Sequence, residues 1–170
     1  MALETVVAGS QIEIKTSPLQ SRVVSTGSNK RVFVVDQDLR LHYFYKTYLE
    51  EIVGRGNVLI FGDYKTAMNT LKSNIFSAYV IDPYLPIGVV DDWGFEFVQY
   101  VYRREGNYDL VWSLSARHDL LKTAEARGIR QVYTKKDPEE AEGYKTKEDF
   151  LNDIKLALSG RGNTTSDTRH

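Results

Sequence analysis

The sequence predicts an α/β protein, a doubly wound sheet of five parallel strands with helices on both faces. The first observation is that five short apolar runs alternate with five amphipathic stretches between residues 30 and 158. The second is that these runs are continuously apolar, which is typical of strands buried on both faces. Because parallel strands are joined by right-handed crossovers through a helix, this pattern favours one open sheet between two helical layers.

Apolar runs define the predicted strands, and caps or glycines bound the predicted helices. Gly54 ends the first helix, Gly128 is a left-handed cap for the fourth, and Thr146 and Gly160 bound the last. We expect strands at 31–36, 57–61, 78–82, 110–114 and 131–134, and helices at 39–53, 63–74, 93–104, 118–127 and 146–158.

Apolar residues at helical spacing support the first two predicted helices. Ala67 and Leu71 are expected on the inner face of the second helix. The apolar residues at helical spacing in the first helix are Leu39, Tyr43, Leu49 and Ile52.

Three segments are not predicted to form regular structure. Residues 1–29 are rich in Ser, Thr and Gly and read as a flexible N-terminal arm, and residues 159–170 read as a flexible C-terminal tail. Residues 83–92 contain two prolines and Gly88, which indicates a loop. The folded domain is therefore expected at residues 30–158.

The composition is that of an ordinary globular domain, with 42% hydrophobic and 26% charged residues. A formal net charge of -1 gives no bulk attraction to nucleic acid or to an anionic membrane. The chain has no cysteine, which excludes disulfides and thiolate metal sites. No apolar run is long enough to span a bilayer. We therefore expect a cytoplasmic protein without a nucleic-acid or membrane partner.

Acidic side chains follow two of the predicted strands. Asp36, with Gln37 and Asp38 after it, follows the first strand, and Asp82 follows the third. In a doubly wound sheet the site lies beyond the carboxyl ends of the strands, where the strand order switches. Two carboxylates brought together there repel each other, and a hard cation such as Mg²⁺ relieves that repulsion.

A hydroxyl and an ammonium group follow the last two strands. Ser115 follows the fourth strand, and Lys135 or Lys136 follows the fifth. Groups of this kind, converging on a carboxylate, suit an anionic phosphoryl group. The strand ends therefore predict a site for phosphoryl transfer in which a carboxylate is the nucleophile.

Four motifs, in this order, resemble those of response-regulator receiver domains. They are the first strand with its acids at 30–38, the acceptor motif at 81–86, the Ser-Ala pair at 115–116, and the glycine, strand and lysine at 128–135. The resemblance covers about residues 30–158. It implies the flavodoxin-like sheet topology and a role in two-component signalling or a phosphorelay.

The resemblance implies a role for each strand-end residue. Asp82 accepts a phosphoryl group from a histidine kinase or a phosphotransfer protein, Ser115 binds the phosphoryl oxygens, and Lys135 pairs with them. Val132 or Tyr133 occupies the switch position of the family, depending on whether Lys135 or Lys136 enters the pocket. A downstream protein partner binds the face formed by the fourth helix, the fifth strand and the fifth helix.

The resemblance also implies a magnesium site. Asp36, Gln37 and Asp82 provide side-chain ligands, and Tyr84 provides a backbone carbonyl. The second acid of the family's pair is Gln37 in this sequence, and its neutral amide is expected to weaken the affinity for the metal.

Two further departures favour an alternative, a pseudo-receiver that binds a protein partner without phosphorylation. The loop after Asp82 is about three residues longer than in the family, and the proline expected after the lysine is absent, with Lys136 and Asp137 preceding Pro138. A magnesium-dependent phosphatase is a weaker alternative, because it needs a second aspartate two residues after the nucleophile, where Tyr84 stands. We expect no enzymatic activity beyond self-phosphorylation and self-dephosphorylation. Asp38 is either a metal ligand or the N-cap of the first helix.

Overall fold

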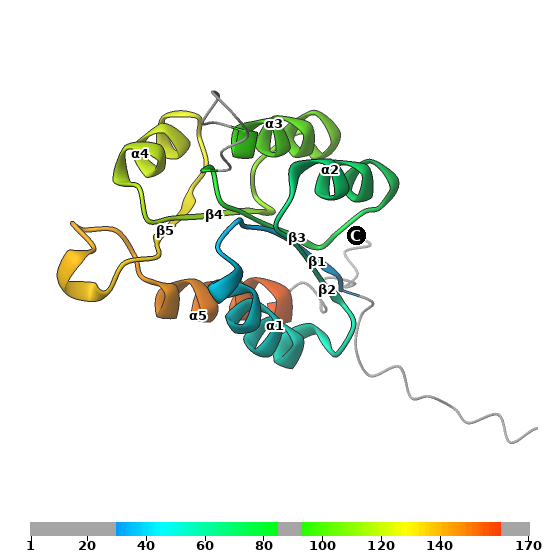
Figure 1. Cartoon of the computed structure of the whole chain (residues 1–170), viewed down its shortest axis with the longest axis horizontal. Helices are drawn as coiled ribbons and strands as arrows, with labels where there is room; N and C mark the ends of the chain where they lie inside the picture. The colour runs from blue at the N-terminus through cyan, green and yellow to red at the C-terminus, as the bar shows by residue number, and fades with distance from the viewer. Residues whose placement is uncertain (1–29, 85–92, 161–170) are drawn as a thin grey trace, which may run out of the picture.

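A computed structural model describes residues 30–84 and 93–160. Five parallel strands form one sheet in the order β2-β1-β3-β4-β5, with helices on both faces (Figure 1). This is the doubly wound, flavodoxin-like arrangement, and it confirms the predicted fold class. The strands are β1 (Val32–Val35), β2 (Val58–Phe61), β3 (Ala78–Ile81), β4 (Val111–Ser115) and β5 (Gln131–Thr134), and the helices are α1 (Leu39–Val53), α2 (Tyr64–Ser73), α3 (Trp93–Glu105), α4 (His118–Ala126) and α5 (Lys147–Gly160).

The predicted elements are all present, because local caps and apolar runs determine where they begin and end. Gly54 and Gly128 both have a φ of 90°, the left-handed conformation expected where a helix stops. Helix α5 continues to Gly160, so the first two residues of the predicted tail are helical. The predicted arm at 1–29, the rest of the tail and loop residues 85–92 lie outside the described residues.

The sheet separates two apolar cores. Helices α1 and α5 cover one face, and α2, α3 and α4 cover the other (Figure 1). Along β1, Phe33 and Val35 belong to the core on the α2–α4 side, whereas Val32 and Val34 belong to the core on the α1–α5 side. All four are fully buried, which is why β1 is continuously apolar. In the part of the chain that the structure describes, no helix has the length and apolar character needed to cross a membrane.

The apolar residues of α1 divide between core and surface. Tyr45 and Leu49 are buried, whereas Leu39 and Tyr43 are 69% and 79% exposed. Apolar residues occupy two neighbouring stripes of this helix, and only contact with the sheet and with α5 decides which stripe turns inward. In α2, Ala67 is fully buried, as predicted.

The connection between β5 and α5 has structure that the sequence did not predict. It contains a short 3-10 helix, η1 (Pro138–Glu140), and a turn in which Glu142 has a φ of 50°. It then returns along β5, where the backbone N–H of Thr134 donates to the carbonyl of Lys145 at 2.8 Å. The chain itself thus covers part of the outer edge of β5.

Candidate functional site

Asp36 and Asp82 lie side by side at the C-terminal edge of the sheet. Val35 of β1 is in register with Ile81 of β3, so the next residue of each strand leaves the sheet at the same point. The strand order also switches direction here, because β2 lies on one side of β1 and β3 on the other. Asp36 is 1% exposed and Asp82 is 4% exposed. The fold therefore brings two buried carboxylates together, as the strand-end pattern predicts.

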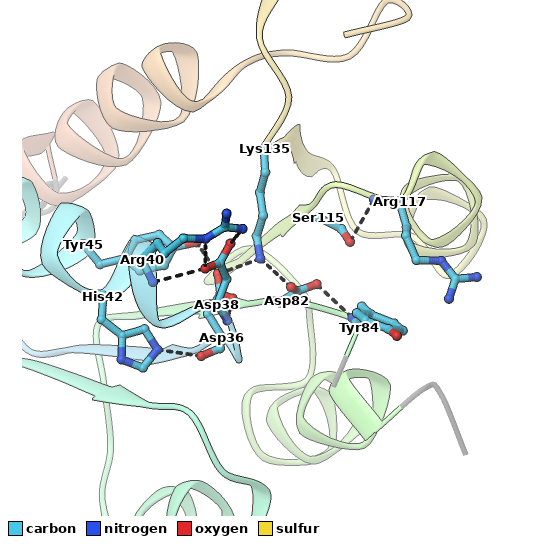
Figure 2. A network of polar contacts seen from close by, with 10 residues as sticks. All are labelled: Asp36, Asp38, Arg40, His42, Tyr45, Asp82, Tyr84, Ser115, Arg117 and Lys135. Atoms are coloured by element: carbon cyan, nitrogen blue, oxygen red, sulfur yellow. Dashed lines mark hydrogen bonds and ion pairs between the residues drawn. The ribbon is translucent and has the colours of Figure 1, made fainter. Parts of the chain in front are cut away.

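Lys135 joins the two carboxylates (Figure 2). It extends from the end of β5, and its Nζ lies 2.7 Å from Asp36 Oδ2 and also contacts Asp82 Oδ2. Its side chain is only 8% exposed. The next residue, Lys136, donates its backbone N–H to Thr134 Oγ1 at 3.1 Å. Of the two candidate lysines, the structure places Lys135 in the pocket.

Asp36 is held by further donors on both of its oxygens. The backbone N–H of Asp38 donates to Oδ1 at 2.9 Å, and the hydroxyl of Tyr45 donates to Oδ2 at 2.7 Å. Tyr45 comes from the buried face of α1. Its burial, together with the charge of Asp36, raises the pKa of Tyr45 well above its usual value, so the hydroxyl keeps its proton and remains a donor.

Burial and charge also control the titration of Asp82. Burial raises the pKa of Asp82 to about 6; the ammonium of Lys135 opposes this rise, and the charge of Asp36 adds to it. For Lys135, burial favours the neutral amine, but the charges of Asp82 and Asp36 outweigh it and raise the pKa. Lys135 is therefore charged at neutral pH, and it faces two carboxylates.

The backbone around Asp82 is tightly packed. The N–H of Tyr84 donates to Asp82 Oδ1 at 2.8 Å. Helix α3 begins directly behind this turn: a Cβ at Gly94 would lie 2.2 Å from the carbonyl oxygen of Asp82 and 2.4 Å from Cα of Pro83. Only glycine, which has no Cβ, allows the start of α3 to lie this close to the backbone of Asp82 and Pro83. This close packing supports the turn that carries the Asp82 carboxylate.

Ser115 ends β4 on the side of Asp82 opposite to Asp36 (Figure 2). It is 1% exposed, and its Oγ accepts the backbone N–H of Arg117 at 3.3 Å. The guanidinium of Arg117 lies 5.1 Å from the centre of the Tyr84 ring and pairs with Asp119 at 2.6 Å. These side chains lie beside Asp82 on the β4 side (Figure 2).

The remaining predicted residues of the first strand end have separate positions. Asp38 is the N-cap of α1, where it accepts the backbone N–H of Arg40 at 3.1 Å. Arg40 also pairs with its carboxylate at 2.7 Å and lowers the pKa of Asp38 to about 2. Of the two roles left open by the sequence, the structure shows the cap. Gln37 is half-buried between Asp36 and this cap.

Comparison with solved structures identifies the fold. The receiver domain of the Francisella response regulator 1452 matches with a TM-score of 0.55 and 21% identity, over 78% of this chain and 98% of that one. The receiver domain of NtrX from Brucella abortus matches with a TM-score of 0.55 and 14% identity, over 75% and 98%. The beryllofluoride-activated receiver domain of NtrC4 matches with a TM-score of 0.56 and 23% identity, over 76% and 97%. No protein-family model and no curated protein sequence matches this chain.

This chain has the receiver fold. The shared topology explains why motifs spread over more than 100 residues meet at one edge of the sheet, at the ends of β1, β3, β4 and β5. Identities below one quarter show the fold alone, so the chemistry of the pocket has to be argued from its own residues.

The strand ends hold some of the donors that the expected magnesium site requires. The carboxylates of Asp36 and Asp82 converge, and oxygen ligands of this type suit a hard divalent cation. No three His, Cys, Asp or Glu side chains in the described ranges form a metal-binding group, and Asp38 is engaged by Arg40. The oxygen donors are therefore of the type that binds Mg²⁺. Two of them, Asp36 and Asp82, are charged, and Lys135 already contacts both.

Val132 and Tyr133, the two candidates for the switch position, face opposite sides of the sheet. Val132 packs in the core on the α4 side. Tyr133 faces the opposite side, where it packs against Phe150 and its hydroxyl donates to Asp153 at 2.8 Å.

Two residues of the site were missed at the level of sequence, Tyr45 and Gly94. Tyr45 belongs to an apolar stripe of α1 and gives no local sign that its hydroxyl meets Asp36. Gly94 lies at the start of a helix, where a glycine is unremarkable in sequence. Both act through contacts that only the folded chain creates.

Proposed function

We propose that this chain is a signalling receiver that accepts a phosphoryl group on Asp82. The observation that carries the proposal is the contact between Lys135 and Asp82 in a pocket that is also bordered by Ser115. An ammonium group held against a carboxylate is suited to pair with phosphoryl oxygens once that carboxylate is esterified.

The proposed reaction follows from these positions. A carboxylate oxygen of Asp82 attacks the phosphorus of a phosphohistidine on a histidine kinase or a phosphotransfer protein. The new P–O bond forms while the P–N bond breaks, and the electron pair stays on the imidazole nitrogen. Lys135 pairs with the transferred oxygens, and Ser115 donates its hydroxyl to them. Asp36 and Asp82, with Gln37 and the Tyr84 carbonyl, would hold Mg²⁺, which would supply charge neutralisation for the phosphoryl group.

The proposed output is a change of protein contacts rather than catalysis on another molecule. A phosphoryl group adds almost two negative charges beside Ser115 and Lys135. The residues that follow them begin α4 and the β5–α5 connection, so movement at the pocket is transmitted to the face formed by α4, β5 and α5. Because the chain covers part of the edge of β5, a partner on this face meets the β5–α5 connection as well.

The test is incubation with Mg²⁺ and a small-molecule phosphodonor, followed by measurement of the intact mass. We expect one phosphoryl group on the native protein and none on Asp82→Asn. Asp38→Asn is the matched control, because Asp38 is a nearby aspartate that caps α1 and pairs with Arg40 instead of Lys135. Labelling that persists in Asp82→Asn would place the acceptor elsewhere.

A second candidate function is a binding module that does not depend on phosphorylation. Two observations favour it: the neutral Gln37 takes the place of an acid, and Lys135 already satisfies both carboxylates. If several phosphodonors leave the mass unchanged and Asp82→Asn retains partner binding, this second function is correct and the first is wrong.

A further inference from the structure

The hydroxyl of Tyr45 is a buried polar group for which the proposed reaction has no direct use. Tyr45 is 1% exposed, on the face of α1 that packs against the sheet. A phenylalanine would fill the same volume without requiring a hydrogen-bond partner. The hydroxyl is directed from helix α1 at Asp36 Oδ2, 2.7 Å away (Figure 2). Buried hydroxyls of this kind restrict the group that they contact.

The carboxylate of Asp36 is contacted by three donors, from Asp38, Tyr45 and Lys135. Its Oδ1 accepts the N–H of Asp38 at 2.9 Å, and its Oδ2 is shared by Tyr45 and the ammonium of Lys135, each at 2.7 Å. A carboxylate with donors on both oxygens cannot rotate freely about its side-chain torsion. Its orientation is therefore defined before any ligand arrives.

Lys135 depends on that orientation. A lysine side chain is a long flexible stem with a compact charge, and one carboxylate does not define where the ammonium lies. Here the ammonium is placed by two carboxylates, Asp36 on β1 and Asp82 on β3, with little access to solvent. If Asp36 were free to turn, the ammonium would lose one of its two fixed partners.

We propose that Tyr45 is a positioning residue: its hydroxyl fixes the carboxylate of Asp36, which in turn holds the ammonium of Lys135 against Asp82 in the metal-free protein. The role for this ammonium in the reaction rests on the proposed function, but the geometry does not require phosphorylation. The receiver pocket is thus prearranged by an internal cation and a tyrosine from α1.

Tyr133 provides a matched control within the same core. Like Tyr45 it is 1% exposed, and both rings pack against Phe150, at centroid distances of 5.7 Å and 6.5 Å. Both hydroxyls donate to an aspartate, but the partner of Tyr133 is Asp153 on α5, away from the pocket. Tyr45→Phe and Tyr133→Phe therefore each remove a hydroxyl that donates to an aspartate from the same core, and only one of them affects Asp36; the Tyr133 bond is the less buried, because the side chain of Asp153 is 36% exposed.

The experiment observes Lys135 directly in unphosphorylated, metal-free protein. The N–H signals of the lysine ammonium groups are recorded by NMR, and Lys135→Met identifies the signal of Lys135. The rate at which an amine-specific reagent modifies Lys135 is measured by peptide mass analysis. We expect a protected Lys135 signal in the native protein and in Tyr133→Phe. In Tyr45→Phe we expect the Lys135 signal to be lost. We also expect the amine-specific reagent to modify Lys135 at least about tenfold faster, the effect expected when a charge-assisted hydrogen bond is lost.

Asp36→Asn is the second variant, and it should expose Lys135 at least as much as Tyr45→Phe does. Equal protection of Lys135 in native protein and in both variants would overturn the proposal, as would equal loss in Tyr45→Phe and Tyr133→Phe. Because no phosphodonor is present, failure of Asp82 to accept a phosphoryl group leaves this result unchanged.

Discussion

Replacement of Lys135 by methionine removes the only cation that both buried carboxylates of the described pocket contact. Asp36 and Asp82 are 1% and 4% exposed, so solvent cannot take over the role of the ammonium. Breaking a buried ion pair by removal of one partner costs about 3–5 kcal/mol, because the remaining charge is uncompensated. We expect Lys135→Met to lower the free energy of unfolding by about this amount at pH 8.

The loss of unfolding free energy caused by Lys135→Met should depend on pH in a defined direction. The pKa of Asp82 in the folded protein is about 6, raised from 3.8, so ionisation of Asp82 destabilises the fold as the pH rises through this window. Without Lys135, which lowers it, the pKa of Asp82 moves higher still. At pH 5 the carboxyl of the variant is therefore protonated, and we expect the cost of Lys135→Met to be smaller than at pH 8 by at least about 1.4 kcal/mol, the equivalent of one pKa unit.

Urea unfolding at pH 5 and pH 8 measures these differences. Lys136→Met is the matched control, since Lys136 lies outside the pocket, and it should change stability by less than about 1 kcal/mol at both pH values. In an Asp82→Asn background the cost of Lys135→Met should shrink, because one of the two unpaired charges is already absent. Equal effects of the two lysine substitutions, or a cost independent of pH, would refute the assignment of Lys135 as the shared counter-ion.

Three further predictions follow from the same pocket. Gln37→Glu adds a third carboxylate, so calorimetric titration should show Mg²⁺ binding at least about tenfold tighter, and the metal-free protein should melt at a lower temperature. If neither the Mg²⁺ affinity nor the melting temperature changes, Gln37 does not face the pocket. A phosphoryl group on Asp82 should be long-lived in a mass-spectrometric time course. The reason is that the Arg117–Tyr84 pair, 5.1 Å from guanidinium to ring centre, lies beside Asp82 and hinders the attack of water on the phosphoryl group. Loss of the phosphoryl group within seconds would contradict this. Gly94→Ala places a Cβ 2.2 Å from the Asp82 carbonyl oxygen, so thermal melts should show destabilisation of about 1–3 kcal/mol, and a native melting point would show that α3 is free to move away.

Much of the fold and the composition of the pocket could be predicted from local features of the sequence. Continuous apolar runs specify strands buried on both faces, and glycines with positive φ mark the ends of helices. The rule that sites lie at the strand ends then selects Asp36, Asp82, Ser115 and one of the pair Lys135 and Lys136, because parallel strands all present their carboxyl ends at one edge. None of this requires knowledge of a contact between distant residues.

Only the tertiary structure decided which side chains touch. The sequence of α1 offers two apolar stripes, and packing against the sheet and α5 buries the stripe with Tyr45 while Tyr43 stays exposed. The choice between Lys135 and Lys136 depends on how β5 pairs with β4, since a shift of one residue turns a side chain to the other face. The hydrogen bond from Tyr45 to Asp36 was also decided only by the tertiary structure. Its acceptor lies outside α1, and periodicity within one helix carries no information about a partner on another element.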